Sequence, residues 1–386
     1  MFENEKIYIA GPECFYANGP QLLKAMRCRA ESLGFGVTLP NDHPLDMENA
    51  LLQKRADSIF ADLEKVMNDS TAIVADLESF RGSEPDSGTV YELGMAYARG
   101  IRCYGYTRDK RPLACKDQQY RLKDGVVYDE HGRPAAYKEL PFCVCVVGST
   151  KIVEGGFDDC LKALMTDLEE EYKRKGRTDQ APETAEIVLE TAFSDSAPES
   201  GDAAYRQAAS GAFSHRRPIA YLSGPERYEE GADALYKKMK EICREHGIEA
   251  RTPLDETEDG AALKEGNPYT QAARLFERWQ KQVRDCDLVI ANLNDYRGYE
   301  CSNDTGFECG MAHQLGKALY GYMDDAGPMK ERVPHLGEEN DFRDPAGCNV
   351  ENFDYPLNLM FGCSMKIFEG RFEEAVKRVA EELGLR

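Results

Sequence analysis

An internal repeat that spans nearly the whole chain is the strongest constraint on its fold. The segment KIYIAGPE at residues 6–13 matches IAYLSGPE at 219–226, an offset of 213 residues (219 minus 6). Two further matches have offsets of 216 (288 minus 72) and 215 (364 minus 149): AIVADLESFRG with LVIANLNDYRG, and STKIVEGGFDDCLKAL with SMKIFEGRFEEAVKRV. A nearly constant offset over this length indicates a duplicated domain with small insertions in its loops.

Within the first copy, short β-branched apolar runs alternate with segments of helical periodicity. This alternation is typical of a parallel sheet with helices on both of its faces. The expected strands are 6–10, 35–38, 71–76 and 101–106, and the expected helices are 18–33, 50–68, 89–99 and 156–174.

The repeat and the composition between its copies predict two domains and a linker. We expect the domains at residues 1–175 and 218–386, packed against each other as a pseudo-dimer within one chain. Residues 176–217 are rich in Ala, Ser, Pro and acidic side chains, which is typical of a linker.

Composition narrows the class of protein. The 386 residues, 42% hydrophobic and 30% charged, suit two globular domains, and no apolar run reaches the length of ~20 residues that a membrane span needs. The start of the chain lacks a signal-peptide pattern, so the expected location is the cytoplasm. A net charge of −21 repels a phosphate backbone, which makes a nucleic acid polymer a poor partner.

Cysteine and histidine usage points away from metal chemistry. The number of cysteines is odd, 13, and most lie in apolar runs, so we expect them to be reduced core residues. There is no CxxC pair, and the 6 histidines are scattered without metal-ligand spacing. We therefore expect neither a metal nor another cofactor.

One acidic segment of the first copy, ADLESFRGSEPDSGTVYELGMA, is a candidate active site. Asp76 ends a predicted strand, and Asp86 and Glu92 lie in the following loop and helix. In a parallel sheet, ligands bind beyond the carboxyl ends of the strands. We therefore expect Tyr8 and Gly11, from the first strand, to lie in one crevice with these three carboxylates.

The same residues also fit a purely structural role. The pair Thr89 and Glu92 matches a capping box at the start of a helix, and Thr305 and Glu308 repeat it. In that interpretation Glu92 lies in the first helical turn, where the helix dipole favours its ionised form. A cap does not account for Asp76 and Asp86, however. Carboxylates that share a crevice have pKa values pushed apart, as a nucleophile and an acid require.

The IYIAGP strand, the aspartate that ends the third strand and PDSGTVYELGMAYARG resemble the nucleoside 2-deoxyribosyltransferase family. The resemblance implies a flavodoxin-like fold in each copy and a double displacement. Glu92 would attack C1′ of a 2′-deoxynucleoside while Asp76 protonates the departing base, and a free nucleobase would then take the deoxyribosyl group. Asp86 would help to hold the sugar, and Tyr8 would lie beside the nucleophile.

Phe15 and Arg81 lie near the crevice in sequence, and each fits either a structural or a substrate-binding role. Phe15 follows the GPE segment and is a candidate for the base pocket, although aromatic residues at such positions more often serve packing. Arg81, in the RG loop, fits a solvated loop residue or a contact to a substrate phosphate.

The second copy departs from the family pattern. Asn292 stands at the position of Asp76 and Ser302 at that of Asp86, while Glu308 is retained.

The first copy has a different defect. Family members carry an asparagine in a PLNLM-like segment that reaches into the neighbouring subunit's site. The second copy has it as Asn358, whereas the first copy has Cys143 at the matching position (358 minus 215). Each copy thus lacks what the other keeps, and we predict one site per chain, built from the first copy with Asn358 supplied by the second.

The expected function is therefore transfer of a deoxyribosyl group between bases. The alternatives are hydrolysis of deoxynucleosides or their 5′-monophosphates at the same Glu92, and a non-catalytic nucleotide sensor. The expected partners are a small nucleoside and a free base, with further association of chains left open.

Overall fold

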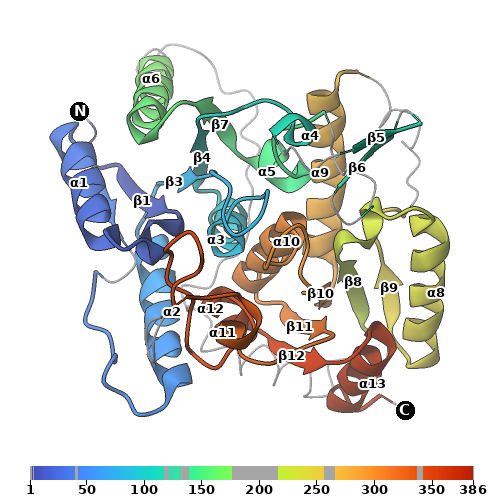
Figure 1. Ribbon diagram of the computed structural model, residues 1–386. Helices are drawn as coiled ribbons and strands as arrows, with labels where there is room; N and C mark the ends of the chain where they lie inside the picture. The colour runs from blue at the N-terminus through green and yellow to red at the C-terminus, as the bar shows by residue number, and fades with distance from the viewer. Residues whose placement is uncertain are drawn as a thin grey trace.

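The computed structural model describes residues 2, 4–39, 42–116, 121–124, 126–129, 132, 139–175, 216–255, 266–336 and 342–385. These residues form two α/β domains that lie side by side (Figure 1). The predicted linker lies outside the described residues except for Arg216 and Arg217. No helix in the described ranges is both long and apolar enough to cross a bilayer.

Each domain contains a five-stranded sheet, and all the strands of each sheet are parallel. The order in the first is β2-β1-β3-β4-β7, and the second repeats it as β9-β8-β10-β11-β12. The first sheet consists of β1 (Lys6–Ala10), β2 (Gly36–Thr38), β3 (Ala72–Asp76), β4 (Arg102–Thr107) and β7 (Lys151–Glu154). The second consists of β8 (Ile219–Ser223), β9 (Glu249–Arg251), β10 (Leu288–Asn292), β11 (Ala318–Met323) and β12 (Lys366–Glu369).

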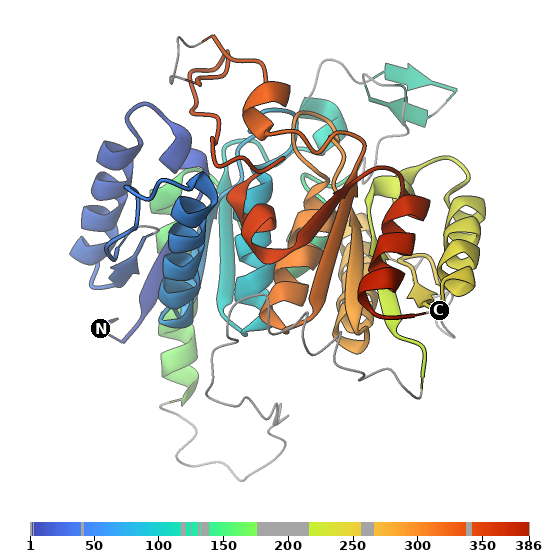
Figure 2. The ribbon, with the colours of Figure 1, turned by 90° about the horizontal axis from the view of Figure 1, so that it is seen from below.

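The helices cover both faces of each sheet (Figures 1 and 2). The outer faces carry α1 (Gly19–Ser32) and α6 (Phe157–Lys175) in the first domain, and α8 (Ala232–Glu245) and α13 (Phe372–Glu382) in the second. The inner faces carry α2 (Leu52–Asn68), α3 (Ser87–Ala98), α9 (Pro268–Asp285) and α10 (Asn303–Gln314). The predicted flavodoxin-like tandem is therefore confirmed.

Shorter elements fill the connections. They are the 3-10 turns η1 (Pro12–Phe15) and η3 (Pro225–Tyr228), the helices α4 (Leu113–Lys116), α5 (Val144–Ser149), α11 (Met329–Arg332) and α12 (Leu359–Ser364), and the hairpin β5 (Arg121–Lys123) with β6 (Val126–Tyr128).

The two domains share one apolar core. A single buried cluster includes Val90 and Leu93 of α3 together with Phe307 and Met311 of α10. The two helices approach closely because both carry glycine at the contact. A Cβ on Gly94 would lie 2.1 Å from the Phe307 carbonyl oxygen.

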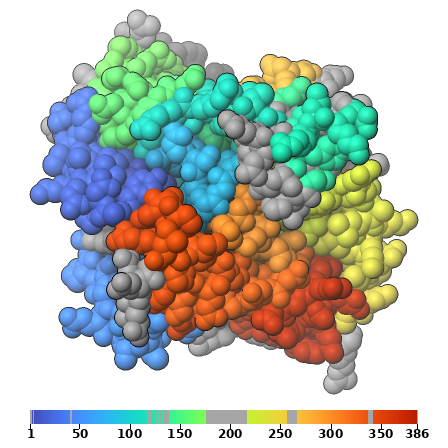
Figure 3. All heavy atoms as spheres, in the orientation of Figure 1, coloured from blue at the N-terminus to red at the C-terminus, as the bar shows by residue number. Residues whose placement is uncertain are grey.

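Each domain also lends a short helix to the other. In the second domain α12 contacts α2 and α3, and in the first domain α5 contacts α9 and α10. Figure 3 shows the segment that precedes α12 lying against the surface of the first domain. Through this exchange, residues far apart in sequence line a common site.

Two details of the predicted elements were wrong. Helix α3 begins at Ser87 and is capped by Asp86, whose carboxylate accepts a hydrogen bond from the Thr89 amide. The predicted capping box of Thr89 with Glu92 is therefore absent, and Glu92 lies in the second turn. The fifth strand, β7, was not predicted, because it has four residues and lies half exposed at the edge of the sheet.

The close approach of α3 and α10 generates a stability prediction. Gly94→Ala forces the new methyl group into the α10 backbone, so we expect a loss of about 1–3 kcal/mol, as for other overpacked contacts. Gly156→Ala is the control, because no atom lies within 4 Å of its added Cβ. Chemical denaturation of both variants measures the effect. Equal stabilities would contradict the tight helix contact.

Candidate active site

A cavity of about 530 Å³ opens beyond the carboxyl ends of β1 and β3. Four predicted site residues of the first domain line it: Gly11, Phe15, Asp86 and Glu92. The second domain contributes Asn358 and, unexpectedly, Glu351. Apolar side chains of α2, among them Leu52, Ile59 and Leu63, form another part of the lining. We call the part of the lining that contains Asp86 and Glu92 the acidic end of the cavity.

Glu92 is the buried carboxylate at the acidic end. Its side chain comes from α3 and is 7% exposed. The Tyr8 hydroxyl donates a hydrogen bond to Glu92 Oε1 at 2.7 Å, and no described residue forms a hydrogen bond with Oε2. Burial raises the pKa of Glu92 to about 8, although the Tyr8 hydrogen bond acts to lower it. One oxygen is thus held and the other is available to a ligand.

The two carboxylate oxygens of Asp86 also differ in their hydrogen bonding. Its Oδ2 accepts hydrogen bonds from the Thr89 amide and hydroxyl, both at 2.7 Å. Its Oδ1 is buried without a hydrogen-bond partner in the described part of the chain. Burial also raises the pKa of this carboxyl. An unpaired buried acceptor is costly, so a donor from a ligand would be well bound here.

Asn358 reaches this end of the cavity from the start of α12. Its Oδ1 caps that helix by accepting from the Met360 amide at 2.9 Å. The space for its side chain depends on Gly88 of α3, because a Cβ at Gly88 would lie 2.4 Å from Asn358 Nδ2. The amide group therefore lies against the same turn that carries Asp86.

Asp76 lies beside the cavity but is not among the residues that line it. Its Oδ1 accepts from the Glu78 amide at 2.8 Å, and its Cβ is 2.9 Å from where a Cβ on Gly11 would be. The carboxyl of Glu13 is a close neighbour. Burial, and next the charge of Asp76, raise the pKa of Glu13 to about 7, and burial raises that of Asp76.

The matching glutamate of the second domain has no free oxygen. Glu308 Oε1 accepts from the Tyr221 hydroxyl and from Arg227, and Oε2 accepts from the Ser223 hydroxyl and from Arg227 again. The ion pair of Arg227 with Glu308 is fully buried. Glu308 is therefore retained as a structural residue.

Two substitutions close the second site. Arg227 stands at the position of Cys14 (227 minus 213), and Trp279 at that of Leu63 (279 minus 216). The guanidinium carbon of Arg227 lies 4.5 Å from the centre of the Trp279 ring, so the two large side chains fill this space together. Both positions lie outside the repeated motifs, so the motifs alone do not reveal these changes.

Asp304 completes the closure. It stands at the position of Gly88 (304 minus 216), and its Oδ1 accepts from the Cys145 amide at 2.9 Å. It thus caps α5, where Cys143 provides no side-chain cap, as Asn358 caps α12. Asp304 also receives a hydrogen bond from the Tyr228 hydroxyl.

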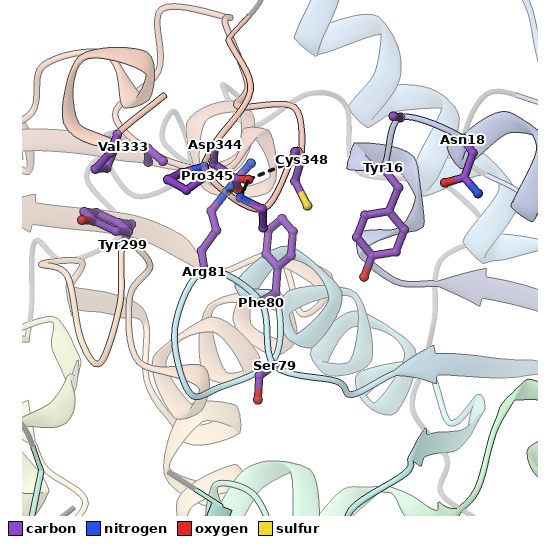
Figure 4. Close-up of a pocket in the computed structure, with 14 residues that line it drawn as sticks. Tyr16, Asn18, Ser79, Phe80, Arg81, Tyr299, Val333, Asp344, Pro345 and Cys348 are labelled. Atoms are coloured by element: carbon purple, nitrogen blue, oxygen red, sulfur yellow. Dashed lines mark hydrogen bonds and ion pairs between the residues drawn. The ribbon is translucent and has the colours of Figure 1, made fainter. Parts of the chain in front are cut away.

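Arg81 is not a solvated loop residue. It is buried between the domains, with an ion pair to Glu300 at 3.5 Å and another to Asp344 at 3.1 Å. Figure 4 shows it directed towards Asp344 at the edge of a second cavity of about 650 Å³. Arg297 forms the reciprocal pair with Glu84 at 3.4 Å. The RG loops therefore join the two domains.

Within the described ranges, no group of three or more His, Cys, Asp or Glu side chains is arranged to hold a metal ion.

Together, these features define a protein of two flavodoxin-like α/β domains, whose described residues form an acidic cavity at the first domain. A model of the nucleoside 2-deoxyribosyltransferase family matches residues 7–137 and again residues 220–360. The chain therefore belongs to the nucleoside 2-deoxyribosyltransferase family, as the motifs predicted, and contains its domain twice.

Individual relatives are distant. An uncharacterized protein of Schizosaccharomyces pombe is 27% identical over 121 residues, which cover 31% of this chain and 56% of the relative. The chain thus spans little more than half the length of that relative.

Two solved structures are also similar. A 2-desoxiribosyltransferase from Leishmania mexicana is 26% identical, with 42% of this chain and 97% of that chain covered and a TM-score of 0.35. A 2-deoxyribosyltransferase from Bacillus psychrosaccharolyticus is 18% identical, with 31% and 86% covered and a TM-score of 0.21. With such low TM-scores, the family match alone carries the assignment.

The closed second site yields a prediction about stability. Arg227→Met leaves Glu308 buried without its cation, so we expect a loss of about 3–5 kcal/mol. Adding Glu308→Gln removes the stranded charge and should restore much of that loss. A double-mutant cycle by chemical denaturation measures the coupling. Additive effects of the two changes would show that the pair is not coupled.

Proposed function

We propose that this protein transfers a 2-deoxyribosyl group between nucleobases through a covalent ester on Glu92. The observation that carries the proposal is the contrast between two equivalent glutamates. Glu308 has both oxygens bound by protein groups, whereas Glu92 Oε2 has no such partner in the described part of the chain and its side chain lines the cavity. A carboxylate kept available in this way suits a nucleophile.

The proposed first step forms a bond between Glu92 Oε2 and C1′ of a 2′-deoxynucleoside. The N-glycosidic bond breaks, and the base leaves with the electron pair and takes up one proton. In the second step, a nitrogen of another base attacks C1′, the ester bond breaks, and the incoming base loses its proton. Two inversions retain the configuration at C1′.

Asp76 is the proposed proton donor in the first step. Its closeness to Glu13 supports this role, because two buried carboxyl groups cannot easily ionise together. At neutral pH the pair therefore holds a proton, and it acts as one titrating unit. The proton returns to this pair when the second base has attacked. Asn292 in the second domain has no such proton to give.

Asp86 and Asn358 are proposed to hold the sugar. Asp86 presents an unpaired acceptor, and Asn358 presents an amide from the other domain. Tyr8 would orient Glu92, Gly11 would leave room beside the reacting carbon, and Phe15 would border the base. The apolar wall formed by α2 suits the flat face of a base.

A product assay with Glu92→Ala tests the function. Deoxyinosine is incubated with free adenine, and the products are separated by chromatography. Deoxyadenosine means transfer, hypoxanthine with free deoxyribose means hydrolysis, and no change favours a sensor. We expect deoxyadenosine from the unaltered protein and none from Glu92→Ala. Because Glu92 must be ionised while the pair of Asp76 and Glu13 keeps its proton, kcat/KM should be highest between pH values of about 7 and about 8 and should fall on either side.

Mass spectrometry of the trapped intermediate provides the direct check. A deoxyribosyl adduct on a carboxylate other than Glu92 would refute the assignment.

A second prediction concerns the composite site. Asn358→Ala should lower turnover by as much as ~10²-fold, since a small misplacement of the bound sugar is enough for such a loss. The double variant Arg227→Met with Glu308→Gln should stay within a factor of a few of the unaltered protein. Steady-state kinetics on folded samples measures both. The opposite pattern would move the working site to the second domain.

A further inference from the structure

Glu351 is a cavity residue to which neither the motifs nor the family match assigns a role. It belongs to the second domain and lies in the loop that leads to α12. Its Oε2 accepts from the Leu359 amide at 3.0 Å, and its Oε1 has no hydrogen-bond partner among the described residues. One oxygen is thus anchored at the start of α12, while the other remains available in the cavity.

The charges around Glu351 favour its neutral form. Burial is the largest influence, and Asp86 and Glu300 add repulsion, so its pKa is raised to about 8. Arg81 opposes this shift, but its guanidinium is already paired with Glu300 and Asp344.

Two thiols are influenced by the charge of this carboxyl. The repulsion from Glu351 contributes to the raised pKa values of Cys14 and Cys363, so both thiols stay neutral near pH 7. At that pH, Glu351 is therefore mostly a carboxylic acid with an O–H group to donate.

Asp86 supplies the complementary group on the facing domain. Its Oδ1 is an unpaired acceptor, whereas Glu351 is a potential donor. A sugar hydroxyl both donates and accepts a hydrogen bond, so the two carboxyl groups match it. Asn358 and Glu351 hold adjacent amides of the same helix, which brings Glu351 to the end of the cavity proposed to hold the sugar.

We propose that Glu351 is a substrate-binding residue that donates a hydrogen bond to a deoxyribose hydroxyl whose proton is accepted by Asp86. This inference rests on the proposed function and specifies how its site selects a sugar. The contact is made across the two domains.

Binding of deoxyinosine to the Glu92→Gln protein tests the proposal, because this background removes the titration of Glu92 and prevents turnover. Isothermal titration calorimetry gives Kd from pH 6 to 9.5. With Glu351 intact, Kd should rise above pH 8 as the donor is lost. Adding Glu351→Gln keeps an N–H donor and should remove the part of this rise that comes from Glu351. The pH dependence that remains then comes from the other ionisable groups of the site and from the N1–H group of the base itself.

Adding Glu351→Ala should raise Kd about tenfold at pH 7, as expected for one lost hydrogen bond. Adding Glu230→Gln, at an exposed position, is the matched control and should leave both Kd and its pH dependence unchanged. The proposal is overturned if Glu351→Ala leaves Kd unchanged, if Glu351→Gln keeps the full rise above pH 8, or if no variant binds deoxyinosine.

Analogues identify the hydroxyl. We expect either 2′,3′-dideoxyinosine or 2′,5′-dideoxyinosine to lose its sensitivity to Glu351→Ala, because the contacted group is then missing. If both analogues keep the full sensitivity, Glu351 contacts no sugar hydroxyl. Failure of the proposed function is seen separately, as an absence of base exchange in the unaltered protein.

Discussion

The buried ion pairs between the RG loops and the facing domain hold the site together. Arg81 is tied to Glu300, and Arg297 to Glu84, so each domain anchors a loop of the other. Charges this deeply buried stabilise only when both partners are present and well placed. They therefore fix the register between the domains. That register, together with the glycine contact of α3 and α10, brings the loop before α12 over the first domain's cavity.

Much of this architecture is readable from the sequence, because duplicated motifs and alternating periodicity survive in both copies. Glu92 and Asp86 are recognisable since they lie in a local motif. Other features depend on packing between distant segments. No local pattern marks Glu351, whose importance arises from the opposite domain. Likewise, no local pattern in η3 indicates that Arg227 pairs with Glu308. A comparison of all the aligned positions of the copies, rather than of the motifs alone, would have flagged the change from Cys14.

The two halves illustrate what duplication permits. In a symmetric dimer, one residue type must serve both copies of every position. Fusion removes this constraint. Gly88 leaves space for the Asn358 amide in the first domain's site, whereas Asp304, at the equivalent position of the second domain, fills the corresponding space there. The second domain then gains saturated hydrogen bonds at its former cavity. The first keeps an open acceptor on Asp86, a less stable arrangement that is typical of functional sites.

The three carboxyl groups that line the open cavity have a further consequence. Burial raises the pKa of Asp86, Glu92 and Glu351, for Glu92 and Glu351 to about 8, so near pH 7 these two glutamates carry protons that the unfolded chain would have released. A ligand that needs any of these groups ionised must displace a proton to the solvent. Ligand binding and proton release are then linked, and the measured heat of binding includes the heat of protonating the buffer. In this sense, the cavity exchanges protons for substrate.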